Sequence, residues 1–428
     1  MPEQNWTSQN SAELKSLVDK LTGELDLYRA NKLSLNLSRG KPASEQLDLS
    51  DAMDLSIAGN FKAADGTDTR NYGGMRGLPE ARALGEEIMG LPAEHIIAAG
   101  NSSLSLMYFC VQTALYQGLF DQSGWQTQGK VRMLAPCPGY DRHFALAEEM
   151  GIELVVVDMQ EDGPDMAAVE AAVRADASVK GIWCVPRFSN PTGCVYSSET
   201  VNRIATLPTL AAADDFVVMW DNAYAVHDIY ADAPELASLH KAALKAGTDN
   251  HMVQFASTSK VTFAGAGVSF VSSGAATLEK IERALGFMTI GADKINQLRH
   301  ARFLGGRVRA HMQQHADILR PKFEQVQSSL HQELGGLGIA TWTEPKGGYF
   351  VSLDVQPGLA QDVIAMAATA GLTLTPAGAT FPSGMDTQNS NIRIAPTFAS
   401  LEELAPAMGI LTLCVKLCTA LKAYQAAQ

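Results

Sequence analysis

Four short segments of the 428-residue chain carry polar side chains that could take part in chemistry. The first three follow apolar stretches and the fourth contains apolar residues; the segments are SNPTG (189–193), WDNAY (220–224), STSK (257–260) and NIRIAP (391–396). Together they supply an amide, a carboxylate, a phenol, a primary amine and a guanidinium group. The guanidinium stands between apolar residues, which is unusual for a surface charge, and a guanidinium fork holds a carboxylate with two parallel hydrogen bonds.

Each segment alone also has an ordinary explanation. Asn-Pro and Thr-Gly pairs are common in turns, Asp221 could cap the next helix, and Lys260 could be a solvated charge. The order and the spacing are harder to obtain by chance, with 31 residues from Asn190 to Asp221 and 39 from Asp221 to Lys260. We therefore treat the four segments as one set.

The elements that must position this set alternate between short apolar runs and helical patterns from about residue 70 to residue 300. The apolar runs are VRMLAP, IELVVVDM, VKGIWCVP, DDFVVMWD, MVQFAS and GVSFVSS. Apolar strands that alternate with helices indicate a mainly parallel sheet covered on both faces, in which ligands bind at the carboxyl ends of the strands. The sequence predicts an α/β fold with a large domain over residues 61–300.

The rest of the chain is expected to form a smaller α+β domain. A helix that opens at Ser11 behind a serine cap, and the extended stretch after it, make up residues 1–60, which join residues 301–428. A long helical stretch from Arg302 to Leu334 contains Pro321, which predicts a kink or break there. GGYFVSLDV and NIRIAPTF are typical of short strands.

Composition narrows the class of protein. The chain has 33 Lys and Arg against 46 Asp and Glu, a formal net charge of −13, so we expect no nucleic-acid partner. Its 46% apolar content is enough for a folded core. The polar N-terminus lacks a signal-peptide pattern, and no stretch reaches the roughly 18–20 uninterrupted apolar residues of a membrane span. Six cysteines in so long a chain indicate reduced thiols, so we expect a soluble, cytoplasmic protein.

The four segments resemble the motifs of the fold-type I enzymes that depend on pyridoxal 5'-phosphate (PLP), specifically the class I/II aminotransferases. Asn190-Pro-Thr-Gly, Asp221-x-x-Tyr224, Ser257-x-Ser259-Lys260 and Arg393 occur in that family's order. LSRGKP, RNYGGMRGLPEAR, PCPGYDRHF and STSKVTFAGAG are most similar to the MocR-like branch of aspartate aminotransferases. The resemblance covers nearly the whole chain and implies transfer of an amino group between an amino acid and a 2-oxo acid.

This resemblance implies three catalytic residues. Lys260 would form the Schiff base with PLP and then move a proton between the substrate Cα and the cofactor. Asp221 would pair with the ring nitrogen and keep it protonated, so that the ring accepts electrons. Tyr224 and Asn190 would donate hydrogen bonds to the ring hydroxyl oxygen. A lysine in a desolvated pocket has a lowered pKa, which suits both of its tasks.

The phosphate of PLP is expected at the start of a helix. Ser102 and Ser103 lead into an apolar helical run, and a helix N-terminus with hydroxyl groups suits an anion. Ser257 and Ser259 would assist them. Many aminotransferases carry an arginine eight residues after the Schiff-base lysine, but Val268 occupies that position here. Other donors must therefore meet the phosphate charge, and the sequence does not identify them.

Three more residues take expected roles from the resemblance. Tyr140 would stack on the cofactor ring, the alternative being an aromatic side chain at a domain surface. His143 would hydrogen-bond to Asp221, the alternative being an ordinary histidine in the first turn of a helix. Tyr72 would reach the phosphate of the neighbouring subunit, so the prediction includes a homodimer with shared active sites.

The substrate is expected to contact Arg393, Gly40 and Asn190. Arg393 would hold the α-carboxylate, and Gly40 in LSRGKP would let the backbone approach closely. We predict a dicarboxylic substrate, aspartate or glutamate, because family-like loops contain more arginine than one carboxylate needs. The candidates for the second carboxylate are Arg39, Arg76, Arg142 and Arg187, each of which could also be an exposed loop charge or an ion-pair partner.

Two other functions stay possible at this point. MocR-type regulators use a related PLP domain to sense an effector, although no basic recognition helix precedes the family-like region here. Another PLP reaction, such as β-elimination, would use the same motifs. No metal is expected: His311 and His315 lie four residues apart without a third ligand, which favours a solvated helix face. Cys414 and Cys418 share an apolar helix face and are expected in the core.

Overall fold

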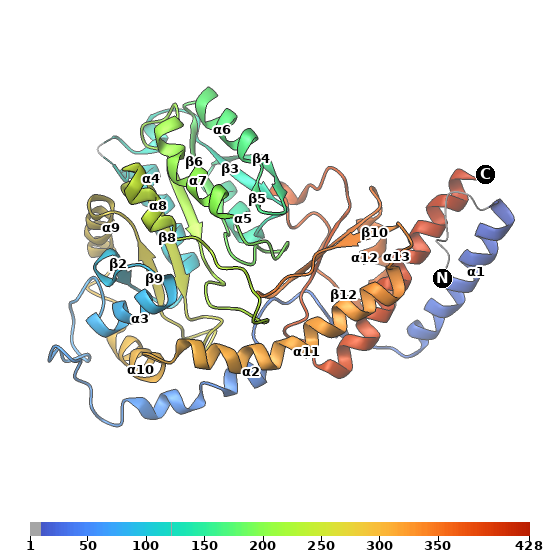
Figure 1. Cartoon of the computed structure of the whole chain (residues 1–428), viewed down its shortest axis with the longest axis horizontal. Coiled ribbons are helices and arrows are strands. Elements are labelled where there is room, and N and C mark those ends of the chain that lie inside the picture. The colour runs from blue at the N-terminus through green and yellow to red at the C-terminus, as the bar shows by residue number, and fades with distance from the viewer. Residues whose placement is uncertain (1–9, 121) are drawn as a thin grey trace.

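The computed structural model of the protein describes residues 10–120 and 122–428 (Figure 1). The first nine residues of the predicted N-terminal segment lie outside the described part. The α-helices are α1 (Ser11–Ala30), α2 (Ser44–Asp48), α3 (Pro79–Met89), α4 (Ser103–Tyr116), α5 (Asp141–Glu149), α6 (Met166–Ala175), α7 (Ser198–Leu210), α8 (Leu239–Ala246), α9 (Ala275–Met288), α10 (Lys294–Leu304), α11 (Val308–Leu334), α12 (Ala360–Thr369) and α13 (Leu401–Ala426). The strands are β1 (Leu35–Asn36), β2 (Ile96–Ala98), β3 (Arg132–Cys137), β4 (Glu153–Gln160), β5 (Gly163–Pro164), β6 (Val179–Cys184), β7 (Val217–Asp221), β8 (Met252–Ser257), β9 (Ser269–Ser272), β10 (Ala340–Trp342), β11 (Val351–Val355), β12 (Leu372–Thr373) and β13 (Asn391–Ile394).

An eight-stranded sheet, ordered β2-β9-β8-β7-β6-β3-β4-β5, is the centre of the large domain. The run from β8 to β4 is parallel, whereas β9 is antiparallel to both of its neighbours and β5 is antiparallel to β4. Both faces are covered: α6, α7 and α8 pack on the face of Leu134 and Ile182, and α4 and α9 on the face of Met133 and Trp183. The predicted α/β fold is confirmed. Strands buried on both sides need continuous apolar sequences, which is why the apolar runs predicted them.

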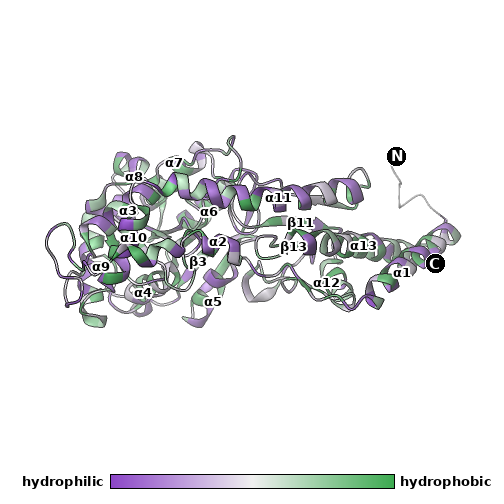
Figure 2. Ribbon diagram, turned by 90° about the horizontal axis from the view of Figure 1, so that it is seen from below, coloured by the Kyte–Doolittle hydropathy of each residue, from purple (hydrophilic) through white to green (hydrophobic). Residues whose placement is uncertain are grey.

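The small domain combines the two ends of the chain. Its antiparallel sheet has the order β10-β11-β13 and packs with α11, α12 and α13. Strand β1 pairs in parallel with β12, with Leu35 opposite Leu372, and α1 lies along α13 (Figure 1). From below, the molecule is elongated, with α9 near one end and α1 near the other, and α1 and α11 carry both hydrophilic and hydrophobic residues (Figure 2).

Helix α13 is long and apolar enough to cross a membrane by length and composition alone, which the sequence analysis did not anticipate. In the folded molecule, 72% of its most apolar window is buried. Cys414 and Cys418 lie on its buried face, as predicted, and all six cysteines are unpaired. The helix therefore serves as the core helix of the small domain.

Three local predictions are wrong. Helix α1 is capped by Asn10 rather than by a serine, because Asn10 accepts from the backbone N–H of Glu13 and the Glu13 carboxylate accepts from Asn10 in return. The stretch after α1 is not extended throughout, since it contains α2 and a 3₁₀-helix at Asp51–Ser56. Of the kink or break predicted at Pro321, the break is wrong: helix α11 continues through Pro321, with buried neighbours such as Phe323 in the core, and the chain instead breaks between α10 and α11.

Candidate active site

The end of β7 and the first turn of α5 together fix a buried carboxylate. Asp221 is the last residue of β7, and its Oδ2 lies 3.0 Å from Nε2 of His143, which donates to it. The His143 ring stacks on Trp183 with ring centroids 4.3 Å apart. The other oxygen, Oδ1 of Asp221, is buried without a hydrogen-bond partner among the described residues. The site thus presents one oriented carboxylate oxygen to a donor that the protein itself does not supply.

Lys260 follows the neighbouring strand β8, so its amine stands at the same sheet edge as Asp221. Its Nζ lies 4.9 Å from the centre of the Tyr224 ring. Burial lowers the pKa of Lys260, and the charge of Asp221 opposes that shift. Burial also raises the pKa of the Tyr224 phenol, which keeps it protonated and able to donate. The arrangement pairs an amine that loses its proton more easily than usual with a nearby phenol donor.

Arg393 on β13 joins the small domain to the large one. Its Nη1 donates to Asp141 Oδ1 at 3.1 Å and to Asn190 Oδ1 at 3.3 Å, and its Nη2 donates to Thr375 Oγ1 at 3.3 Å. The guanidinium lies over the Phe350 ring, 5.0 Å from its centre, and its Nε is buried without a partner among the described residues. This geometry is that of a carboxylate-binding arginine, and Asp141 is the carboxylate that it holds.

The N-terminal segment packs at Gly40 against Phe350, the ring over which the Arg393 guanidinium lies. A Cβ atom on Gly40 would lie only 2.1 Å from Cζ of Phe350, so this close approach requires glycine. Arg39, the residue before it, is exposed, with its guanidinium carbon 5.8 Å from the centre of the Phe398 ring. The segment thus packs Gly40 against the ring that lies under the Arg393 guanidinium, with Arg39 as the preceding residue.

Hydroxyl groups gather where α4 begins. Ser102 caps the helix without using its side chain, and Ser103 is the first helical residue. Ser259 Oγ donates to the Asn101 carbonyl at 3.3 Å, and Ser257 Oγ donates to Ser259 Oγ at 3.1 Å. These serines come from two separate elements and surround free backbone N–H groups at a positive helix end, which is a ready anion site.

Three residues singled out in the sequence lie in three different environments. Tyr140 precedes α5, with its ring edge-on to His143 at a centroid distance of 4.9 Å, and thus belongs to the Asp221 cluster. Tyr72 is 82% exposed and does not join this cluster within one chain. The Val268 side chain is buried in an apolar cluster. No cation stands at its position, in keeping with the departure seen in the sequence.

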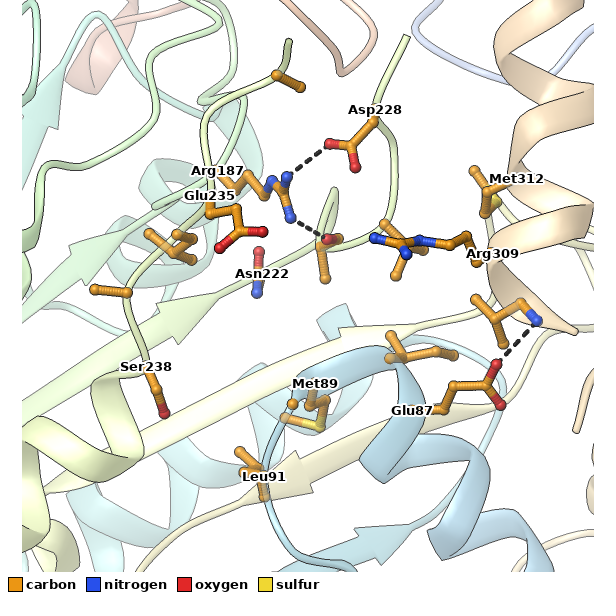
Figure 3. Close-up of a pocket in the computed structure, with 18 of the residues that line it drawn as sticks. Glu87, Met89, Leu91, Arg187, Asn222, Asp228, Glu235, Ser238, Arg309 and Met312 are labelled. Atoms are coloured by element: carbon orange, nitrogen blue, oxygen red, sulfur yellow. Dashed lines mark hydrogen bonds and ion pairs between the residues drawn. The ribbon is translucent and has the colours of Figure 1, made fainter. Parts of the chain in front are cut away.

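Two of the four candidate arginines are engaged elsewhere. Arg76 forms an ion pair with Glu282 at 2.7 Å. Arg187 donates to Asp228 at 2.7 Å and to the Ala225 carbonyl at 2.9 Å, inside a separate cavity of about 640 Å³ (Figure 3). Arg39 and Arg142 are exposed and form no ion pair with any described residue, which leaves these two as the candidates for the second carboxylate.

The sequence analysis missed several residues of the site. Asp141 follows Tyr140 directly, so its place in a helix first turn could have marked it. Phe350 and Thr375 belong to the small domain and carry no motif. The prediction for His311 and His315 is wrong, because both are buried rather than solvated. No group of three or more potential metal ligands occurs among residues 10–120 and 122–428.

Comparisons with known proteins agree with this geometry. The family model described as aspartate amino-transferase matches residues 9–427. A Mycolicibacterium smegmatis protein described as an aminotransferase is 48% identical, covering 91% of this chain and 92% of that protein. The aspartate aminotransferase of Corynebacterium glutamicum is 44% identical, covering 93% and 92%. A solved structure of an aspartate transaminase from that organism superposes with a TM-score of 0.95 at 41% identity, covering 98% of this chain and all of that one. The chain belongs to the aspartate aminotransferase family of fold-type I transaminases.

Proposed function

We propose that the transaminase binds PLP between β7, α4 and Lys260. The observation that carries this proposal is the buried Asp221 Oδ1, which lacks a donor that a protonated ring nitrogen would supply. The anion site at α4 suits the phosphate, and the aromatic ring of Tyr140 adjoins the Asp221 cluster. PLP, when bound, supplies an electron sink that stabilises negative charge at the substrate Cα. The residues present fit that group.

Each of the protein's own side chains then has a separate role. Lys260, with its lowered pKa, is the amine that would hold the cofactor and would accept and return a proton at the substrate Cα. Tyr224, whose phenol stays protonated, would donate a hydrogen bond to the cofactor, and Asn190 would help to orient the cofactor ring. His143 holds the Asp221 carboxylate so that its free oxygen faces the position of a hydrogen-bond donor.

For the substrate we propose an amino dicarboxylate, with aspartate as the first choice. Arg393 is the anchor of the α-carboxylate, which would take the place of Asp141 on the guanidinium. Arg39 is the candidate for the distal carboxylate, because it is exposed and precedes Gly40, which packs against the Phe350 ring under Arg393. Relatives named as aspartate aminotransferases at 41–44% identity support this choice.

We further propose a homodimer with shared active sites. Large apolar side chains are exposed together at the end of α9 and in the Tyr72 loop: Phe287 is 78% exposed and Ile290 is 65% exposed. The loop is attached there, since Gly73 N donates to the Ile290 carbonyl at 2.9 Å. Covering this patch with a second copy would bury it and carry Tyr72 toward the partner's α4.

Cytoplasmic location is also a proposal, supported by six unpaired cysteines. We propose no nucleic-acid or membrane partner, since the net charge of −13 disfavours both polyanions and anionic surfaces. The partners are then a small amino acid and a 2-oxo acid.

A panel of amino donors tests the reaction. With 2-oxoglutarate as acceptor, we expect aspartate to convert the PLP-loaded protein to its pyridoxamine form faster than alanine or phenylalanine. Equal rates for the three donors would remove the dicarboxylate proposal and leave the transaminase standing. Release of pyruvate and ammonia without the pyridoxamine form would instead indicate β-elimination.

A further inference from the structure

Two histidines of α11 hold the main chain next to Lys260. Nε2 of His311 lies 2.7 Å and Nε2 of His315 lies 2.9 Å from the Val261 carbonyl oxygen. A peptide carbonyl only accepts, so both Nε2 atoms carry a proton. Burial lowers the pKa of both rings, that of His315 to about 4, and both are neutral at pH 7. Nδ1 of His315 is therefore an acceptor.

Gln46 on α2 supplies the donor that this acceptor needs. Its Nε2 lies 3.3 Å from His315 Nδ1 and 3.0 Å from the Tyr349 hydroxyl, and its Oε1 accepts from Ala43 N at 3.1 Å. The side chain is fully buried, and its amide is engaged at both ends. The Ala43 contact fixes which end is oxygen, so the amide has one orientation.

The Lys260 carbonyl lies at the far end of this chain of hydrogen bonds. The Tyr349 hydroxyl accepts from Gln46 and so donates onward to Lys260 O at 3.4 Å, while His227 Nε2 donates to the same oxygen at 3.2 Å. Gln46 thus acts, through Tyr349 and His315, on the carbonyls of both Lys260 and Val261. These are consecutive residues, so the network fixes the base of the reactive side chain.

At its other end the hydrogen-bond network includes the segment of residues 39–46, which lies beside the proposed substrate site. Lys322 Nζ on α11 lies 2.5 Å from Glu45 Oε1 and 3.2 Å from the Thr397 carbonyl, and Thr397 Oγ1 donates to the Lys41 carbonyl at 3.1 Å. The segment of residues 39–46 is therefore fastened as one piece. It carries Gly40 against Phe350 at one end and Gln46 at the other.

We propose that Gln46 is a positioning residue that couples the segment of residues 39–46 to the main chain of Lys260. The position of this segment beside the substrate site and the position of the Lys260 amine then change together. The inference rests on the proposed function only in taking Lys260 as the reactive amine. Without Gln46, His315 Nδ1 and the Tyr349 hydroxyl lose a buried partner, and their rings must move to find another.

The test compares two buried glutamines replaced by methionine, which is of similar length and makes no such hydrogen bonds. Gln46→Met breaks the network. Gln297→Met is the matched control, because Gln297 is equally buried and bridges Leu78 N and Ala98 O without touching the Lys260 main chain. Both should lower the midpoint of thermal unfolding by similar amounts, because each loses buried hydrogen bonds.

Only Gln46→Met should change the surroundings of Lys260. In the PLP-loaded protein we expect the pH midpoint of the visible cofactor band to shift by on the order of one unit, because the amine is displaced from its fixed place. We expect kcat to fall about tenfold, with a smaller change in the KM for the amino donor. Amide hydrogen exchange in a peptide containing residues 260–262 should accelerate, with or without cofactor.

The outcomes separate the two proposals. Unchanged exchange and an unchanged band midpoint in Gln46→Met overturn the coupling. The same changes in Gln297→Met also overturn it, since general destabilisation would then explain them. If the wild-type protein shows no visible band with PLP, the proposed function fails, and the exchange measurement still decides the coupling.

Discussion

At the scale of single residues, the site rests on two neighbours whose surroundings suit them to opposite roles. Asp221 is held by His143 and keeps one free oxygen, whereas Lys260 is buried beside the Tyr224 ring and has a lowered pKa. In the proposed function, Asp221 would keep a proton on the cofactor ring nitrogen, whereas Lys260 would give up its own proton. Parallel strands place them together, because β7 and β8 end at the same edge of the sheet.

Replacing either residue should separate binding from chemistry. Lys260→Ala should abolish the visible band and turnover of the PLP-loaded protein, and circular dichroism should show an intact fold. Asp221→Ala should retain the band but lower kcat by about 10²–10³-fold, a typical loss when one preorganised electrostatic partner is removed. A borohydride-trapped cofactor in Lys260→Ala, or a near-normal rate in Asp221→Ala, would contradict these roles.

At the scale of elements, the start of α5 contributes to two parts of the site at once. Tyr140, Asp141 and His143 stand within four residues, and the turn directs His143 to Asp221 and Asp141 to Arg393. Helix α9 and the Tyr72 loop form a second unit of this kind, because their exposed apolar side chains lie at one edge of the large domain.

The exposed patch at the end of α9 gives a prediction about assembly. Phe287→Asp should weaken the dimer, because a charge would have to be buried at the subunit contact, and activity should fall as Tyr72 leaves the partner's site. Leu244→Asp is the control, since Leu244 is 51% exposed on α8, away from this patch. Sedimentation that shows a fully active wild-type monomer would contradict the shared site.

At the scale of the whole molecule, the long helix α11 runs from the large domain into the small one (Figure 1). Its first half carries His311 and His315 beneath Lys260, and its second half buries Phe323 and Leu330 in the small-domain core. Buried neutral histidines at such a junction tie the stability of the fold to pH.

Stability should therefore fall on acidification. Burial lowers the pKa of His315 from 6.5 to about 4 and that of His227 to about 3. Above pH 6.5 the native and unfolded chains bind equal protons at these rings, but below it the unfolded chain binds more. Each ring should remove up to about 1.4 kcal/mol of unfolding free energy per pH unit.

Urea unfolding at pH 7.5, 6.0 and 5.0 measures this dependence, since most carboxylates stay ionised in that range. His315→Gln should keep a donor near Val261 and show a shallower loss between pH 6.5 and 5. Equal slopes in the two proteins would contradict the contribution of this histidine.

The sequence allowed the fold class and the strand-end motifs to be predicted because both depend on local pattern. Apolar runs marked β3, β6, β7 and β8, and the motifs of Asn190, Asp221 and Lys260 lie at or after the ends of β6, β7 and β8. The MocR-like branch stays a prediction, since the comparisons identify the family without it.

What the sequence did not reveal depends on contacts between distant segments. The burial of His311 and His315 is set by Val261, about 50 residues away in the chain, and by Gln46. Thr375 and Phe350 reach Arg393 only through the pairing and packing of the small domain. A helix face that looks polar in sequence can thus be an internal one.

The bond between Arg393 and Asp141 means that the protein carries its own competitor for the substrate. If Arg393 anchors the substrate as proposed, an arriving α-carboxylate would have to displace Asp141, which is held close by, and Asp141 would return as the product leaves. Because part of the binding free energy of the guanidinium would go into displacing Asp141, the affinity for the substrate would be lower and the release of the product faster. A transaminase uses one pocket for both half-reactions in turn. Competition from Asp141 would therefore favour turnover over tight binding of substrate or product.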